Sequence, residues 1–224
     1  MNAPHPYSAL TPDVVVSAVE ALGHRCDGRI LALNSYENRV YQVGREDSTP
    51  VVVKFYRPER WPDAAILEEH EFALELARAE IPVIAPDVHE GRSLFKHEGF
   101  RYAVYPRAGG RWPELGTGDD RQWMGRFLAR IHAIGRIRAF RHRPRLDWRV
   151  LGQETADYLL DSGWIPSHLE VAYASLAEDV LSLVEQRFEE AMPLRTLRLH
   201  GDCHPGNVLW TDKGPHFVDL DDCM

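Results

Sequence analysis

A short segment rich in turn-forming residues, 106–113 (PRAGGRWP), divides this 224-residue chain into two halves of different character. Its prolines and glycines interrupt both helix and strand, so it is the best interior boundary in the chain. The half before it is dominated by β-rich runs, and the half after it begins with helical patterns. We therefore predict an α+β fold of two lobes, residues 1–105 and 114–224, joined by a hinge at 106–113.

Helices and strands are placed by periodicity and by residues that start or stop them. Thr11 and Pro12 suit the first positions of a helix, and Ile66, Phe72 and Leu76 share one face of another. In the N-terminal half we expect a short helix that Gly23 ends, strands at 40–43 and 51–56 joined by an open loop at 44–50, a helix at 62–80, and strands at 93–95 and 100–105. In the C-terminal half we expect helices at 123–137 and 167–191, followed by strands at 196–199, 208–210 and 216–218.

Composition excludes several classes of function. The net charge of −8 arises from acids spread along the chain, which argues against nucleic-acid binding. No apolar run approaches the roughly 20 residues that span a bilayer, and the N-terminus lacks a signal-peptide pattern. Three irregularly spaced cysteines do not describe a disulfide framework. We expect a cytoplasmic, monomeric protein with reduced thiols and no membrane partner.

A lysine and a glutamate in the N-terminal half could act together on nucleotide phosphates. Lys54 alternates with Val52 and Tyr56 on one strand face, although a lone strand lysine is usually just solvated. Among the acids of the 62–80 helix, only Glu69 lies on the core-facing stripe. We therefore choose Glu69 as the partner of Lys54, against the alternative that these acids form a solvated face.

The run 200–207 (HGDCHPGN) carries the strongest chemical signal. Gly201 and its neighbouring turn residues constrain the backbone, and Asp202 and Asn207 stand five apart. Phosphoryl transfer requires a carboxylate near the attacking hydroxyl and oxygen ligands for Mg²⁺. Asp202 can accept the hydroxyl proton, Asn207 can bind Mg²⁺ through its amide oxygen, and Asp219 closes a nearby strand as a further ligand.

Three alternatives compete with this interpretation. An Asx-rich turn without chemistry would explain 200–207 alone, but not the carboxylate at Asp219. A zinc site built from His200, Cys203, His204 and Cys223 does not match the usual ligand spacing. A Walker-type NTPase is excluded because the chain contains no Gly-x-x-x-x-Gly-Lys-Ser/Thr run.

The order of these motifs resembles the aminoglycoside phosphotransferase and choline kinase branch of the protein-kinase-like fold. Within that branch, four segments resemble a group of bacterial serine/threonine kinases of the envelope-stress response, and the likeness covers essentially the whole chain. These segments are 33–41 (LNSYENRVY), 53–61 (VKFYRPERW), 67–70 (LEEH) and 218–222 (VDLDD).

The resemblance implies roles for individual residues. Asp202 and Asp219 match the catalytic carboxylates, Asp202 as proton acceptor and Asp219, with Asn207, as Mg²⁺ ligand. Lys54 and Glu69 match the ion pair on the ATP phosphates, and Ser35 lies in the loop that covers those phosphates. This loop contains no glycine, so its Asn and Ser side chains must assist the backbone. Asp221 could be an additional metal ligand.

The resemblance also implies ATP as phosphate donor and a protein Ser/Thr hydroxyl, or a small-molecule hydroxyl, as acceptor. Members of the branch continue beyond the metal-binding segment with helices that complete the second lobe. We therefore expect a lobe that is incomplete at Met224, and a nucleotide-binding pseudokinase or inactive truncated form is the rival hypothesis.

Overall fold

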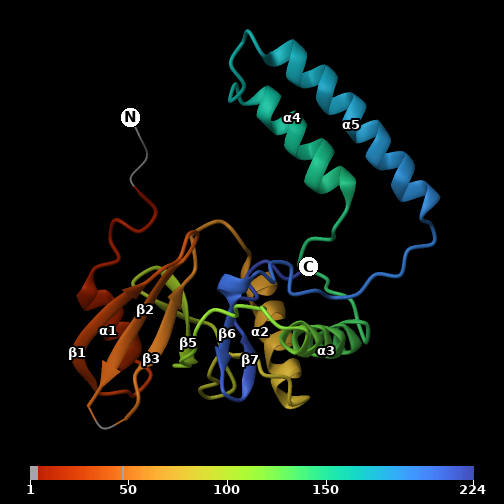
Figure 1. Ribbon diagram of the computed structural model, residues 1–224. Helices are drawn as coiled ribbons and strands as arrows, with labels where there is room; N and C mark the ends of the chain where they lie inside the picture. The colour runs from red at the N-terminus through yellow and green to blue at the C-terminus, as the bar shows by residue number, and fades with distance from the viewer. Residues whose placement is uncertain (1–4, 47) are drawn as a thin grey trace.

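The computed structural model describes residues 5–46 and 48–224 and confirms the α+β class. An antiparallel sheet of five strands in the order β1-β2-β3-β5-β4 forms the N-terminal part, drawn in orange and green in Figure 1. Neighbouring strands pair in register, for example Val53 of β3 with Tyr41 of β2 and with Val104 of β5. The strands are β1 (Cys26–Leu33), β2 (Arg39–Arg45), β3 (Val51–Phe55), β4 (Phe95–His97) and β5 (Phe100–Pro106).

Helix α1 (Pro12–Glu20) begins as its sequence predicts. The Thr11 side chain accepts a hydrogen bond from the Val14 amide at 3.3 Å and so satisfies one free N–H of the first turn. The apolar face of α1, with Val15 and Val19 fully buried, packs on the sheet beside Phe55. Burial of each such side chain stabilises the fold by about 2 kcal/mol.

Helix α2 (Asp63–Arg78) joins the two parts of the molecule. Its buried Phe72 and Leu76 share a core with Ile131 of α3 (Gly118–Gly135) and Phe217 of β7 (Gly214–Phe217). Strand β7 pairs with β6 (Val208–Thr211) in a hairpin that follows the 3₁₀ turn η2 (Pro205–Asn207). The segment after α2 bonds to the end of this hairpin, since Phe217 donates to the Pro82 carbonyl at 2.7 Å and accepts from the Ile84 amide at 2.9 Å. These contacts bring 218–222 beside α2.

Two further helices stand away from this body, at the upper right of Figure 1. They are α4 (Glu154–Asp161), which continues a π-helical turn η1 (Arg149–Gln153), and α5 (Glu170–Glu190). No residue of α5 is buried, and its apolar residues Leu176, Val180 and Leu183 are exposed. None of the helices in the described part of the chain combines the length and apolar character needed to cross a membrane.

The structure corrects the predicted elements in several places, and helix α3 begins at Gly118, five residues before the predicted start. Residues 196–199 form no strand, because the Arg198 amide donates to Gly135 and Leu199 pairs with Met224, so the segment has no single partner strand. Strand β4 starts two residues later than predicted. Strand β1 and helix α4 were not predicted. The loop predicted at 44–50 includes Asp47, which lies outside the described residues, as do residues 1–4.

Candidate phosphotransfer site

A cleft of about 320 Å³ lies between the N-terminal sheet and the β6–β7 hairpin. Ser35, Lys54, Glu69, Asn207 and Asp219, which the sequence singles out for the nucleotide or the metal, line it, whereas Asp202 and Asp221 do not. The lining includes Ser35, Val40, Val52 and Lys54 from the sheet side, Glu69 and His70 from α2, and Asn207 and Asp219 from the C-terminal part. The fold thus brings into one cleft residues that lie far apart in the sequence, such as Ser35 and Asp219, which are 184 positions apart.

Lys54 is the electrostatic centre of the cleft. Its buried ammonium lies 2.9 Å from Asp219 Oδ1, 3.3 Å from Asp221 Oδ1 and 3.6 Å from Glu69 Oε1. Burial alone would lower the pKa of Lys54, but these carboxylates outweigh it and hold the pKa well above its usual value. Lys54 therefore stays cationic, which is the state that an anionic phosphate would require.

The carboxylates around Lys54 differ in their environment. Burial raises the pKa of Glu69, while Lys54 opposes that effect. The Lys54 charge lowers the pKa of Asp219, whose side chain is half exposed to the cleft. Asp219 therefore remains an accessible anion, whereas Glu69 is enclosed and can act only through Lys54. The choice of Glu69 over its helical neighbours agrees with this placement.

Asp221 is held by protein groups on both oxygens. Its Oδ2 accepts a hydrogen bond from Asn38 Nδ2 at 2.9 Å, and its Oδ1 faces Lys54. Asn38 Oδ1 in turn accepts from the Arg57 amide at 3.0 Å, so the buried Asn38 fixes the loop between β1 and β2. Asp221 thus links Lys54 to this loop.

Ser35 lies at the mouth of the cleft, in the same loop. Its hydroxyl donates to the Asn38 carbonyl at 3.0 Å, which closes a tight turn over residues 35–38. Asn38 is a residue that sequence reasoning missed, and its only signal was its place in a segment already singled out.

The Asp202 loop is fixed by its backbone. Gly201 adopts a φ of 86°, and a Cβ at this position would overlap the Asp222 carbonyl oxygen. His200 Nε2 lies 3.0 Å from the Val218 carbonyl, and the Val218 amide donates to the Asn207 carbonyl at 3.0 Å. Only glycine allows the Asp202 loop and the 218–222 segment to approach so closely.

Asp202 and Asn207 face each other within the loop. Asn207 Nδ2 donates to the Asp202 carbonyl at 2.9 Å and to its carboxylate Oδ2 at 3.1 Å. With its amide nitrogen occupied in this way, Asn207 presents its Oδ1 as a free acceptor. The Asp202 side chain is half exposed, 3.6 Å from His204 Nε2.

The donor set fits a hard cation that also binds phosphate oxygens. Asn207 Oδ1 and the Asp219 carboxylate are oxygen ligands of the kind Mg²⁺ prefers. Among residues 5–46 and 48–224, no three His, Cys, Asp or Glu side chains gather as a metal cage. The protein therefore supplies few ligands, and the zinc alternative finds no support, since Cys223 is buried and Cys203 exposed.

A hydrogen-bonded network closes the back of the cleft. His70 Nε2 lies 2.6 Å from the Tyr56 hydroxyl, His70 Nδ1 lies 2.8 Å from Ser93 Oγ, and the Tyr56 hydroxyl lies 2.9 Å from that of Tyr105. The network ties α2 to the sheet at the residue next to Glu69. Burial lowers the pKa of His70 to about 3, with a further contribution from the Lys54 charge.

This pKa makes the stability of the fold sensitive to acid. Because the unfolded imidazole titrates near 6.5, the unfolded chain binds more protons below that pH, and stability falls as the pH falls toward 3. Between pH 7 and 5 we expect His70 to account for a loss of about 2 kcal/mol. Urea unfolding at pH 7 and pH 5 measures this loss. In His70→Gln the free energy of unfolding should fall between the two pH values by about 2 kcal/mol less than in the wild-type protein. His168→Gln, at an exposed position, is the control, and an unchanged acid loss in His70→Gln would contradict the prediction.

The cleft thus lies between a five-stranded sheet and a β-hairpin, and it brings a buried Lys–Glu pair close to an Asp/Asn loop. Residues 29–224 match the phosphotransferase enzyme family, and the chain belongs to it. It is 44% identical over 221 residues to stress response kinase A of Escherichia coli strain K12, covering 99% of this chain and 66% of the relative. It is 44% identical over 216 residues to the serine/threonine protein kinase RdoA of Salmonella typhimurium, covering 96% of this chain and 65% of the relative.

Solved structures confirm the kinase-like fold. An amicoumacin kinase in complex with AMP-PNP, Ca²⁺ and its ligand superposes with a TM-score of 0.75 at 21% identity, over 94% of this chain and 64% of that one. A spectinomycin phosphotransferase with ADP and spectinomycin gives a TM-score of 0.62 at 15% identity, over 94% of this chain and 68% of that one. The chain thus spans about two thirds of the length of these relatives.

Proposed function

We propose that this protein is an ATP-dependent phosphotransferase that acts on serine or threonine hydroxyls of a protein in a bacterial stress response. The observation that carries the proposal is the position of Lys54, which contacts Glu69 and Asp219 at the floor of a cleft lined also by Asn207. The names of the two bacterial relatives support the acceptor class and the setting.

In this proposal the domain assignment follows the expected lobes. Residues 1–105 bind the nucleotide, 106–113 form the hinge, and 114–224 carry the catalytic residues. Lys54 binds the phosphates while Glu69 holds its ammonium in place, and Ser35 borders the phosphates at the mouth of the cleft. Asn207 and Asp219 hold Mg²⁺, which when bound neutralises charge on the phosphates.

Asp202 acts on the acceptor. Its carboxylate takes the proton of the attacking hydroxyl as that oxygen bonds to the γ-phosphorus and the bond to the β–γ bridging oxygen breaks. The products are the phosphorylated acceptor and ADP. Hydrogen bonds from Asn207 orient Asp202 and leave its second oxygen free for the hydroxyl.

The test is mass analysis of a generic protein substrate, and of the protein itself, after incubation with ATP and Mg²⁺. We expect an added phosphate on a serine or threonine. Transfer only to small-molecule hydroxyls would favour the alternative acceptor class. Nucleotide binding without any transfer would favour the pseudokinase.

The metal assignment makes a separate prediction. Because the protein offers few ligands, Mg²⁺ should bind weakly alone and at least about tenfold more tightly with a non-hydrolysable ATP analogue. Asp219→Asn should abolish this coupling, because the charge that opposes the cation is lost. Paired calorimetric titrations with and without the analogue measure it.

Asp222→Asn is the matched control, since Asp222 is a nearby acid that pairs with Arg60 at 2.7 Å outside the cleft. It should retain the coupling. Tight Mg²⁺ binding without nucleotide, or coupling that survives in Asp219→Asn, would show that Asp219 is not the ligand.

A further inference from the structure

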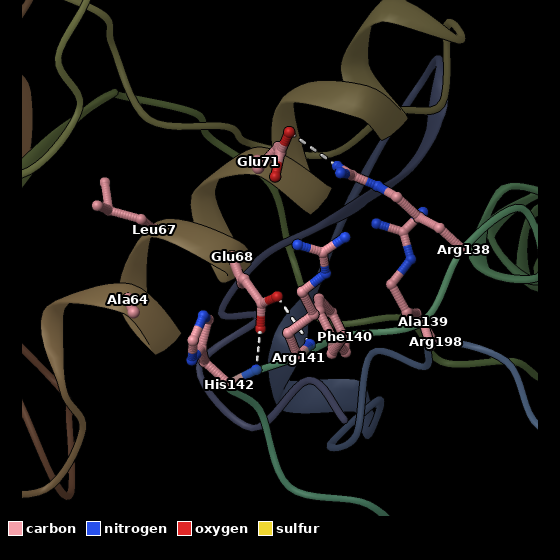
Figure 2. Close-up of a pocket in the computed structure, with 10 residues that line it drawn as sticks. All are labelled: Ala64, Leu67, Glu68, Glu71, Arg138, Ala139, Phe140, Arg141, His142 and Arg198. Atoms are coloured by element: carbon pink, nitrogen blue, oxygen red, sulfur yellow. Dashed lines mark hydrogen bonds and ion pairs between the residues drawn. The ribbon is translucent and has the colours of Figure 1, made fainter.

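Glu68, the neighbour of Glu69 on α2, binds a segment of the C-terminal part. Its Oε1 accepts from the Arg141 amide at 2.8 Å, and its Oε2 accepts from the His142 and Arg143 amides at 2.7 and 3.2 Å. Figure 2 shows the carboxylate pointing from α2 at this backbone, across a pocket of about 610 Å³. Three successive N–H groups on one carboxylate form a charge-assisted anchor.

The anchored segment carries a buried arginine that reaches the metal-binding segment. Arg143 Nε donates to the Cys223 carbonyl at 2.8 Å, and its Nη2 donates to the Asp221 carbonyl. The guanidinium lies 4.2 Å from the centre of the Trp61 ring, just before α2 begins. A planar guanidinium suits this role because it can bond two carbonyls and stack at once.

These contacts form one chain of connections. Glu68 fixes α2 to residues 141–143, and Arg143 fixes the same residues to the backbone of Asp221, whose side chain contacts Lys54. Lys54 is thus approached from two elements, Glu69 on α2 and Asp221 after β7. One segment outside the cleft holds both elements.

We infer that Glu68 and Arg143 are positioning residues that lock α2 and the 219–223 segment in the arrangement that places Glu69 and Asp219 on Lys54. Neither residue touches the cleft, and their effect on nucleotide binding passes through Lys54 and Glu69. The effect on nucleotide binding rests on the proposed function. The contacts that hold α2 and the 219–223 segment together are a property of the fold and do not depend on it.

Amide hydrogen exchange on the intact protein tests the lock without any ligand. Glu68→Gln leaves one acceptor oxygen and turns an amide NH₂ toward the backbone N–H groups. Arg143→Lys keeps the positive charge but loses the planar guanidinium that donates to two carbonyl oxygens. Both should speed exchange at least about fivefold in α2 and in 220–224, because local opening depends on these contacts. The control is Glu71→Gln, in the same helix and pocket, where the half-exposed carboxylate pairs with Arg138 at 2.9 Å. Faster exchange confined to 141–143 would overturn the inference.

A double-mutant cycle separates positioning from general stability. Glu69→Gln should weaken binding of an ATP analogue about tenfold in the wild-type and Glu71→Gln backgrounds, but less than about threefold in Glu68→Gln, because coupled residues are not additive. Equal losses in all three backgrounds would contradict the positioning role. Failure of the wild-type protein to bind the analogue would refute the proposed function, and the exchange result would still decide whether the lock exists.

Discussion

Asp202→Ala is expected to reduce phosphate transfer by about a thousandfold, the usual scale for loss of a positioned general base. The affinity for an ATP analogue should change less than about twofold, because in the proposed mechanism Asp202 contacts the acceptor hydroxyl and neither the phosphates nor the metal. The structure explains why the loop should survive the change. Asn207 also donates to the Asp202 backbone carbonyl, and that bond does not need the carboxylate.

Turnover and analogue binding must both be measured on the same preparations. Asp212→Ala, in the turn between β6 and β7, is a control acid outside the cleft and should retain transfer. A large loss of analogue binding in Asp202→Ala would place Asp202 in the metal site and reverse its role with that of Asp219.

Gly201→Ala is expected to have the largest effect on stability. A Cβ here overlaps the Asp222 carbonyl oxygen, which cannot move without displacing the segment that carries Asp219 and Asp221. Alanine is also strained at this positive φ. We expect the overlap and the strain together to lower the free energy of unfolding by about 3 kcal/mol or more. The surviving folded protein should also bind nucleotide and Mg²⁺ weakly.

Gly163→Ala separates the two contributions. Gly163 also has a positive φ, of 66°, but a Cβ there would meet nothing within 4 Å. Gly163→Ala should lower the free energy of unfolding by about 1 kcal/mol, which is the contribution of backbone strain without steric overlap. Equal losses in the two variants, measured by urea unfolding, would mean that the Asp202 loop can move away from Asp222 without penalty.

Local sequence signals were reliable where a single element carries its own pattern. Thr11 and Pro12 start α1, the apolar stripe of α2 places Glu69 on its inner face, and β-rich runs yield β2, β3 and β5. Strand β1 was missed because its pairing is irregular between Cys26 and Ile30 and most of its residues are exposed, so no apolar alternation marks it. The extended residues 196–199 carry strand-like composition, yet their partners lie on two different segments.

The identity of the chemical groups was also readable from sequence. Asp202 and Asn207 stand in one constrained loop of the sequence, and the structure adds the hydrogen bond between their side chains. The pairing of Lys54 with Glu69, and the place of Asp219 beside them, agree with the predicted cleft.

Contacts between distant segments were decided by the tertiary structure. Asn38 and Asp221 are 183 residues apart, and Glu68 and His142 are 74 apart. Residues 136–149 contain several arginines, and nothing in the sequence indicates that Arg143 is the buried one. The sequence by itself indicated which residues are candidates for binding phosphate and metal and located most of the helices and strands that present them, because periodicity and turn chemistry act over a few residues. Only the packing of α2 against β7 and residues 141–143 decided how those groups are held, because such contacts depend on the whole path of the chain.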